Sequence, residues 1–556
     1  MLLLVGTSAV LALRNDSEEN DGRQPEQEEP EFVPKRAFLK DACNLPPKWV
    51  RLIHRGWAPG RARDADLTLV PRPMNYVGGP LSTSHSGPYD FLQEVPLIFY
   101  GRGYIEKRGG ISPNREVSLV DVAPTLAEIM KFDSWPRREG MVLAEAIKPN
   151  PEPPALVVEI MIDGGGWNDL EYWPDRWPNL RRLMQEGTSF DNAIVGSSPS
   201  ITPAIHTNIS TGTYPRLHEV TGIVVRAKSG KITGGFSERS RQSGADYTVP
   251  DVTIAESTLA DEWDIANGND PKIGALLPGN YPLGMVGIGR AQAGGDGDIV
   301  GFTVDTTWAT KAPYYTLPDY VNSPDLSVDE YVEAVDRGDG NADGQWQGHD
   351  IRPIDATPAL APWQTRVAEE IITREEFGKD ELTDMFLMNY KAPDAAGHMW
   401  NMIADEQGDV IESVDTAMGD LVEWLDENVG PDNYVLVISA DHGQTPLKAG
   451  GWPIRRSEVL ADVNRRFDHL DNERSLIQAT SASSLFLDAE ELAANNVTAS
   501  ETASFLSRYT VRANLPPGED LPPDWQDRGN ERVFSAVVPG GRLPDVVQCT
   551  GALDRS

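Results

Sequence analysis

The stretch Val157–Asp163 reads VVEIMID, a continuous apolar run that ends on an aspartate. Such a run is typical of a strand that is buried on both faces, as in a parallel sheet covered by helices. Two later stretches have the same form, Met385–His398 (MFLMNYKAPDAAGH) and Tyr434–Gly443 (YVLVISADHG). Because the carboxyl ends of parallel strands meet at one edge of a sheet, their Asp and His residues should converge there. The sequence therefore predicts an α/β fold with a polar site at that edge.

Strands and helices alternate from Ala155 onward, which predicts a mostly parallel sheet sandwiched by helices. We expect residues 156–550 to form the main α/β domain, which carries the polar site. Within it, residues at about 221–380 are richer in Gly, Asp and Tyr and have weaker periodicity, which favours an insertion or cap. Residues 149–155 form a proline-rich connector, and residues 41–148 before it contain further strand-like and helical patterns.

Residues 1–40 are expected to be either a disordered tail or a weak signal or anchor segment. The apolar run Leu2–Leu13 is twelve residues long, too short to span a bilayer comfortably, and an acidic, Gln/Pro-rich stretch follows it. Membrane contact is expected at most through this segment. The sequence leaves export, membrane tethering and a cytoplasmic location open.

The chain is strongly acidic, with 85 Asp and Glu against 49 Lys and Arg and a formal charge of −36. This charge repels polyanions, so we expect no binding to a nucleic-acid duplex. A polyanionic substrate would also be slowed unless a metal centre reversed the potential locally. The two cysteines, Cys43 and Cys549, exclude a thiolate zinc site. A bridge between them requires the chain ends to meet, and two inert thiols are the simpler expectation.

The segment Pro199–Gly212 (PSITPAIHTNISTG) offers a hydroxyl nucleophile. Thr202 followed by Pro203 is typical of a helix start, with Thr202 as the N-cap. A hydroxyl in this position lies beside free backbone N–H groups and the positive end of the helix dipole. Capping alone would also explain a threonine here, but the neighbouring motifs favour Thr202 as the nucleophile, with Ser200 as the alternative.

Asp and His residues near the strand ends supply candidate metal ligands. Asp394 and His398 lie four residues apart, so on a helical turn both could bind one cation, although a surface pair has the same spacing. Asp441 and His442 follow an apolar strand directly, and charged groups in such a place need a partner that a metal can supply. Asp163 adds a third carboxylate at a strand end.

Four of these segments, VVEIMIDGG, PSITPAIHTNISTGTYPRLHEV, NYKAPDAAGH and VISADHGQT, resemble successive motifs of the alkaline phosphatase superfamily. The nearest branch is the type I phosphodiesterase/nucleotide pyrophosphatase group. The resemblance implies an alkaline-phosphatase-like fold and hydrolysis of a small-molecule phosphate mono- or diester through a phospho-threonine. It also implies two Zn²⁺ ions, with other divalent ions left open. It assigns one zinc to Asp163, Thr202, Asp441 and His442, and the other to Asp394 and His398.

In this family the second zinc also receives a histidine from a motif near the carboxyl terminus. In the later chain His469 matches that motif poorly. By contrast, Thr83–Gly101 (TSHSGPYDFLQEVPLIFYG) and Val117–Ala127 (VSLVDVAPTLA) resemble the family's carboxyl-terminal segments, but they precede the first strand. The resemblance therefore implies a circular permutation in which residues 41–148 complete the catalytic fold, with His85 as the missing ligand. An ordinary loop histidine is the alternative.

The substrate and the activity are less sharply defined. Nucleotide pyrophosphatases commonly carry an Asn after the nucleophile that contacts phosphate, and the corresponding stretch His218–Val225 has none. Nucleotide specificity therefore stays open. The alternatives to a hydrolase are a phosphoryl or headgroup transferase of the same superfamily, and a catalytically inactive metal-binding protein.

A separate acidic stretch has the spacing of a calcium loop. Residues 339–350 (DGNADGQWQGHD) would place ligands at Asp339, Asn341, Asp343 and Asp350. Asp stands at the last position, where such loops have Glu, so an acidic Gly-rich turn is the favoured interpretation and Ca²⁺ the alternative.

Overall fold

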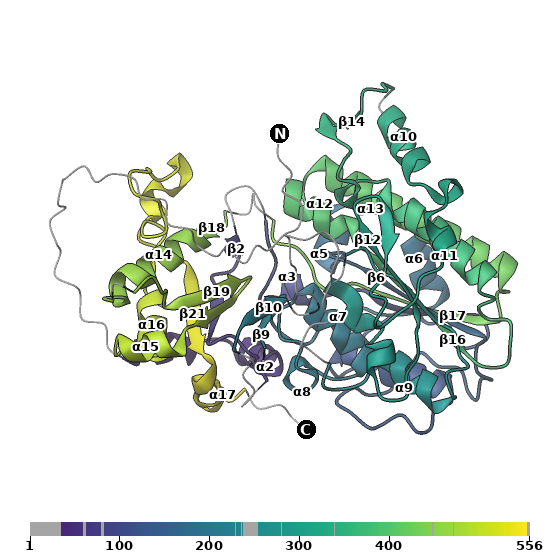
Figure 1. Ribbon diagram of the computed structural model, residues 1–556, viewed down its shortest axis with the longest axis horizontal. Helices are drawn as coiled ribbons and strands as arrows, with labels where there is room; N and C mark the ends of the chain where they lie inside the picture. The colour runs from purple at the N-terminus through teal and green to yellow at the C-terminus, as the bar shows by residue number, and fades with distance from the viewer. Residues whose placement is uncertain are drawn as a thin grey trace.

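The computed structural model describes residues 35–552 except 59–62, 79–82, 228–229, 235, 237–253, 280, 339, 447–449 and 471. Most of the expected tail thus lies outside the described residues. The chain folds into two lobes that lie side by side (Figure 1). The larger lobe contains a nine-stranded sheet, and the smaller lobe contains a four-stranded sheet.

The large sheet confirms the predicted α/β class. Its strand order is β13-β12-β11-β16-β6-β17-β3-β7-β4, and most neighbouring pairs are parallel. The central strand β6 (Leu156–Ile162) is parallel to both β16 (Asp384–Tyr390) and β17 (Tyr434–Ser439), so the three predicted strands are neighbours. The other strands are β3 (Leu97–Tyr100), β4 (Gly109–Ile111), β7 (Thr188–Phe190), β11 (Ile273–Leu276), β12 (Ile299–Val304) and β13 (Thr307–Ala309).

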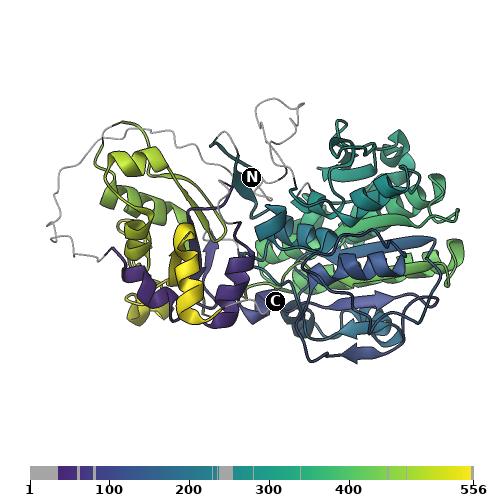
Figure 2. The ribbon, with the colours of Figure 1, turned by 90° about the horizontal axis from the view of Figure 1, so that it is seen from below.

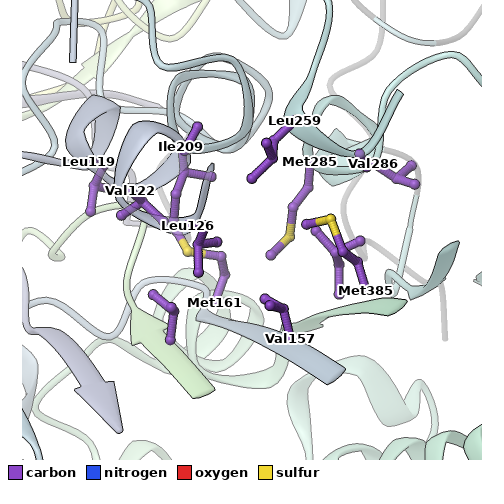
Figure 3. Packing of buried hydrophobic residues seen from close by; sticks show 14 of the residues in the cluster. Leu119, Val122, Leu126, Val157, Met161, Ile209, Leu259, Met285, Val286 and Met385 are labelled. Atoms are coloured by element: carbon purple, nitrogen blue, oxygen red, sulfur yellow. The ribbon is translucent and has the colours of Figure 1, made fainter. Parts of the chain in front are cut away.

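Helices cover both faces of this sheet. Successive side chains of β6 point to opposite faces, and all of them are buried. Val157 and Met161 pack into one apolar layer, and Val158 and Ile160 into the other. Figure 3 shows the first layer, in which Ile209 and other apolar side chains lie over β6. The first layer includes α4 (Val122–Ile129), α7 (Thr202–Thr211) and α9 (Leu259–Ala266). The second includes α6 (Pro178–Glu186), α11 (Leu360–Arg374) and α13 (Asp405–Asn428).

The region expected to be an insertion, residues 221–380, contributes directly to the core. Strands β11 and β12 lie inside the large sheet, and α9 and α11 pack on its two faces. These strands are short and separated by long irregular segments, so their sequence shows little periodicity. Only part of the region is therefore peripheral, including the β14–β15 hairpin (Gln345–Trp346 and His349–Asp350).

The smaller lobe is built from both ends of the chain. Strand β1 (Leu67–Pro71) pairs antiparallel with β20 (Ser484–Leu487) and β21 (Phe534–Pro539), and β19 (Ile477–Ser481) completes the sheet. Range 41–148 is thus divided between the lobes. Figure 2 shows helices from the two chain ends, purple and yellow, side by side. The helices are α1 (Ala37–Ala42), α2 (Pro47–Arg55), α14 (Arg456–Phe467), α15 (Ala489–Ala494), α16 (Ala499–Leu506) and α17 (Leu543–Thr550).

Cys43 and Cys549 form a disulfide, which corrects the expectation of two inert thiols. The bond is favoured because both chain ends pack into one core. Phe38 on α1 and Val546 on α17 are both fully buried in the same apolar cluster. The disulfide therefore links the first and last helices of the smaller lobe.

Short elements connect these parts. They are α3 (Asp90–Gln93), α5 (Trp167–Tyr172), α8 (Pro215–His218), α10 (Asp329–Gly338), α12 (Ala392–Trp400), β2 (Tyr76–Gly78), β5 (Val117–Ser118), β8 (Ala193–Ile194), β9 (Val224–Arg226), β10 (Ile232–Gly234) and β18 (Pro453–Arg455). Among the described residues, no helix is both long and apolar enough to cross a membrane.

Candidate active site

The candidate site lies where the three central parallel strands end. Asp163 follows β6 directly, Asp441 follows β17 by two residues, and α12 begins just after β16. Gly164 brings these ends together, because its φ of +74° suits glycine and its N–H donates to Asp441 Oδ1 at 3.0 Å. A Cβ at Gly164 would lie 3.0 Å from the Cα of Asp394. A larger residue would therefore force the strand ends apart.

Thr202 faces these carboxylates. Helix α7 begins at Thr202 with Ile201 as the N-cap, one residue earlier than expected, so Thr202 is the first helical residue. Its Oγ1 lies 3.5 Å from Asp163 Oδ1, and the residue is 5% exposed. Ser200, in contrast, is fully buried, and its hydroxyl donates to the carbonyl of Gly87 at 3.4 Å. Of the two candidate hydroxyls, Thr202 is the one in contact with a carboxylate.

His85 and His398 meet at one oxygen of Asp394. Their Nε2 atoms lie 3.0 Å and 3.2 Å from Asp394 Oδ1. Each ring contacts a backbone carbonyl through Nδ1, His85 at Ser200 (3.0 Å) and His398 at Thr83 (2.6 Å). A carbonyl only accepts, so Nδ1 carries the proton, and in a neutral ring Nε2 presents a lone pair. A lone pair that faces a carboxylate oxygen needs a proton or a cation between them.

The charges in this group are strongly coupled. Burial lowers the pKa of His398, but the facing Asp394 carboxylate outweighs burial and raises it. Burial likewise works against ionised Asp394, yet His398 and Lys391 hold the pKa of this carboxyl well below its usual range. Asp394 is therefore ionised and demands a positive partner.

His442 lies between the two groups of carboxylates. Its Nε2 is 3.4 Å from Asp441 Oδ2, 3.7 Å from Asp163 Oδ1 and 3.9 Å from Asp394 Oδ1. Its Nδ1 donates to the carbonyl of Gly443 at 3.0 Å, so Nε2 is an acceptor in the neutral ring. Burial and the neighbouring His85 hold the pKa of His442 well below its usual range, which keeps this ring neutral.

Several of these atoms have no hydrogen-bond partner within the described part of the chain. They are His442 Nε2, Asp441 Oδ2 and Asp394 Oδ1, all buried. Unpaired buried acceptors that converge are costly, and divalent cations would satisfy them. The mixed nitrogen and oxygen donors match the ligand preference of zinc. The residues present therefore fit a metal centre.

His206 belongs to the same cluster, although the sequence did not identify it as a ligand. Its Nδ1 lies 3.6 Å from Asp441 Oδ2 but also 2.9 Å from the carbonyl of Thr202. Its Nε2 lies 3.1 Å from Asn389 Oδ1. Both ring nitrogens are thus engaged with protein oxygens, and His206 acts as a support for the start of α7.

Sequence reasoning missed Lys391 and Asn389. The Lys391 Nζ lies 3.1 Å from Asp163 Oδ1 and contacts Asp394 Oδ2. Burial works to lower the pKa of Lys391, but the carboxylates of Asp163 and Asp394 have the larger effect, so the pKa is raised. Asn389 Nδ2 donates to Asp163 Oδ2 at 3.0 Å. The available signal was an Asn and a Lys at the end of an otherwise apolar strand.

The stretch with calcium-loop spacing does not form part of this site. Asp339 lies outside the described residues, Asn341 and Asp343 precede the β14–β15 hairpin, and Asp350 is in β15. Asp343 accepts a hydrogen bond from the Gln345 N–H at 3.1 Å. Among the described residues, the groups of side chains suited to a metal include neither Asp343 nor Asp350. His349, also outside the site, contacts Glu406 at 2.7 Å.

Comparisons with known proteins identify the family of this chain. Residues 157–549 match the family described as type I phosphodiesterase / nucleotide pyrophosphatase. A protein of Myroides odoratus named calcium-transporting ATPase is 23% identical over 62% of this chain and 71% of its own length. Alkaline phosphatase PafA of Elizabethkingia meningoseptica is 24% identical over 55% of this chain and 62% of its own length.

The fold has a solved counterpart. The crystal structure of wild-type PafA superposes with a TM-score of 0.50 at 20% identity, over 70% of this chain and 85% of that one. The likeness covers the fold, and the match over residues 157–549 covers most of the sequence. The chain therefore belongs to the type I phosphodiesterase/nucleotide pyrophosphatase family of the alkaline phosphatase superfamily, a group of metal-dependent hydrolases of phosphate esters.

Proposed function

We propose that this chain hydrolyses small-molecule phosphate esters through a phospho-threonine at Thr202. The observation that carries the proposal is the convergence of unpaired buried acceptors on Asp394, Asp441 and His442 beside that hydroxyl. Two divalent cations, zinc by ligand chemistry, would be held there. One ion would take His85, Asp394 and His398, which lie together in the structure. The other would take His442, the carboxylates of Asp163 and Asp441 at 3.7 Å and 3.4 Å from its Nε2, and Thr202 beside Asp163.

The protein residues have defined tasks in this reaction. When bound, zinc lowers the pKa of a coordinated hydroxyl and stabilises charge on phosphoryl oxygens. Thr202 Oγ1, having lost its proton to water, forms a bond to phosphorus while the bond from phosphorus to the leaving oxygen breaks. Water then attacks phosphorus, the bond to Thr202 breaks, and phosphate leaves, or a phosphate monoester if the substrate was a diester. The start of α7 favours the negative charge throughout.

The arrangement of the amino-terminal segment supports a circular permutation. His85 lies just before α3 and β3, and β3 is paired antiparallel with β17 in the large sheet. Because it is antiparallel, β3 begins at the edge where β17 ends, which brings His85 to Asp394. We infer that residues 83–148 supply the part of the catalytic fold that other members of the family place at their carboxyl end.

Substitution of the nucleophile tests the proposal. Zinc-loaded wild-type, Thr202→Ala and Ser200→Ala proteins would be compared on p-nitrophenyl phosphate and bis(p-nitrophenyl) phosphate. Thr202→Ala should lose about a thousandfold or more in kcat while keeping its metal, because a covalent nucleophile is gone. Ser200→Ala is the matched control, since its hydroxyl faces Gly87 and should be dispensable.

The intermediate gives a second readout. Acid quenching during turnover of a ³²P-labelled ester should leave label on Thr202 in the wild type and none in Thr202→Ala. Inactivity of Ser200→Ala together with an active Thr202→Ala would move the nucleophile to Ser200. Absence of turnover in the zinc-loaded wild type on both esters would favour an inactive metal-binding protein instead. The ratio of the two wild-type rates gives the preference between monoester and diester.

A further inference from the structure

A second group of carboxylates lies at the opposite edge of the large sheet. Asp264 is on α9, and Asp296 and Asp298 lie just before β12. One oxygen from each of these three side chains lies within 4.8 Å of the others. Strand β12 is parallel to β6 through β11 and β16, so its beginning lies at the edge away from Thr202. This cluster is therefore separate from the candidate active site.

The two inner carboxylates of this cluster make no hydrogen bond or ion pair within the described part of the chain. Asp264 and Asp298 are 4% and 7% exposed. Nearby Arg290 donates to the carbonyls of Ala312 and Tyr315, and its charge offsets only part of the repulsion at Asp298. Burial and the neighbouring acids raise the pKa of Asp264 to about 7 and that of Asp298 well above its usual range.

The surroundings hold these carboxylates in place. Asp261, one turn before Asp264 on α9, accepts hydrogen bonds from the N–H groups of Ile288 and Gly289, each at 3.0 Å. A Cβ at Gly289 would lie 3.2 Å from Asp298 Oδ2. Asp261 thus fixes the turn at Gly289 against α9, and the absence of a side chain at Gly289 lets this turn approach Asp298 closely. The backbone around the cluster is held by these hydrogen bonds, and the carboxylates of Asp264 and Asp298 lie close to each other within it.

We propose that Asp264, Asp296 and Asp298 bind a calcium ion. Oxygen donors without histidine or cysteine select a hard cation, and Ca²⁺ accepts carboxylates with irregular geometry and fills its remaining positions with water. Asp296 is exposed, so water can reach this side of the cluster. The ion would cross-link α9 to the segment before β12, far from the reacting atoms, and so stabilise this end of the sheet.

Calcium binding can be counted while zinc fills the other site. Full-length protein saturated with Zn²⁺ would be dialysed against ⁴⁵Ca²⁺. We expect about one equivalent of calcium at submillimolar concentration. Asp298→Asn and Asp264→Asn should weaken this binding at least about tenfold. Asp343→Asn is the matched control, because it removes the same charge from the stretch that has calcium-loop spacing.

Thermal unfolding gives an independent readout. Wild-type protein should gain a few degrees in Tm at millimolar calcium, whereas Asp298→Asn should gain none. Without calcium, Asp298→Asn should unfold at the wild-type Tm or above it, because the variant lacks a carboxyl whose ionisation is opposed by burial and by the neighbouring acids. A lack of saturable calcium binding in the zinc-saturated wild type would overturn the proposal. Loss of binding in Asp343→Asn with retention in Asp298→Asn would also overturn it.

Discussion

The two lobes of the molecule follow opposite plans. The larger lobe is formed by strands and helices that alternate along the chain, with β6, β16 and β17 side by side. The smaller lobe pairs residues from the two chain ends, for example Leu67 of β1 with Pro539 of β21. All proposed zinc ligands and Thr202 belong to segments of the larger lobe or lead directly into it. The difference separates the lobe that holds the proposed active site from the lobe that supports it.

The support has an identifiable point of contact. Ser86, next to the proposed ligand His85, hydrogen-bonds the hydroxyl of Ser483 in the smaller lobe at 2.7 Å. The Tyr89 hydroxyl donates to the carbonyl of Pro71 in β1. Both contacts act on the segment between β2 and β3 that carries His85. The smaller lobe therefore holds the segment that carries the proposed ligand His85, and none of the other proposed ligands belongs to this lobe.

The largest effect on activity is expected when a histidine of the larger lobe is replaced, and replacement of a histidine in the smaller lobe should have no effect. His85→Ala should lower kcat/KM for p-nitrophenyl phosphate by about a thousandfold, ~4 kcal/mol, because it removes a ligand from a three-residue site. Elemental analysis should show the loss of about one zinc per chain. His469→Ala in the smaller lobe is the matched control, since His469 is exposed, and it should retain activity and both metals.

Two outcomes of this experiment would contradict the assignment of the zinc site to the larger lobe. If His85→Ala kept wild-type activity and zinc content, His85 would be an ordinary loop histidine and the permutation would lose its functional support. If His469→Ala lost zinc, the smaller lobe would supply a ligand after all.

The site could largely be predicted because its chemistry follows the strand pattern. Asp163, Asp394 and Asp441 come just after apolar runs. Parallel strands bring such positions together at one edge of the sheet, independently of the conformation of the loops. Thr202 was recognisable from the helix start at Pro203. For these residues, local sequence and a general rule of α/β folds were sufficient.

The rest depends on contacts between residues far apart in sequence. The pairing of β1 with β21 and the Cys43–Cys549 bond join the chain ends, and no local pattern marks either partner. Lys391 has a role only because Asp163 and Asp394 come to its ammonium in the folded state. Asp298 likewise joins Asp264 only through the packing of α9, in a region whose short strands gave weak periodicity.

An effect of intermediate size is expected on the pH dependence of the free energy of unfolding. It comes from Glu159, which is buried in the middle of β6 in the larger lobe. Its Oε1 has no hydrogen-bond partner within the described residues, and burial raises its pKa to about 8. The unfolded chain releases this proton near pH 4.5, whereas the folded chain keeps it up to about pH 8. The folded state thus binds more protons between these values, so stability falls as pH rises through them.

Glu159→Gln should remove this loss. The variant should gain on the wild type by about 1.4 kcal/mol per pH unit near pH 6 and by less as pH 8 is approached. The total gain should be roughly 2 kcal/mol between pH 6 and pH 8 in urea unfolding of zinc-loaded protein. Glu171→Gln, at an exposed position on α5, is the matched control and should follow the wild type. Parallel pH dependence for Glu159→Gln and the wild type would show that Glu159 is already ionised or hydrated in the folded state.

The smallest effect on activity is expected from the smaller lobe, in the double variant Cys43→Ser/Cys549→Ser. The cross-link joins residues 506 apart, so its removal gives the unfolded chain more freedom and should cost about 2–4 kcal/mol of stability. The buried Phe38 and Val546 keep α1 and α17 packed, so the lobe should still form and its calorimetric transition should fall by a few degrees.

Activity of this variant at 25 °C should stay within about twofold of the wild type, because the contacts from Ser86 and Tyr89 to the smaller lobe remain. Wild-type protein treated with a reductant is the control and should match the variant in both measurements. A loss of activity and zinc as large as in His85→Ala would mean that the smaller lobe, held by its disulfide, is what keeps His85 against Asp394. The two lobes would then form one catalytic unit, and the separation of chemistry from support would fail.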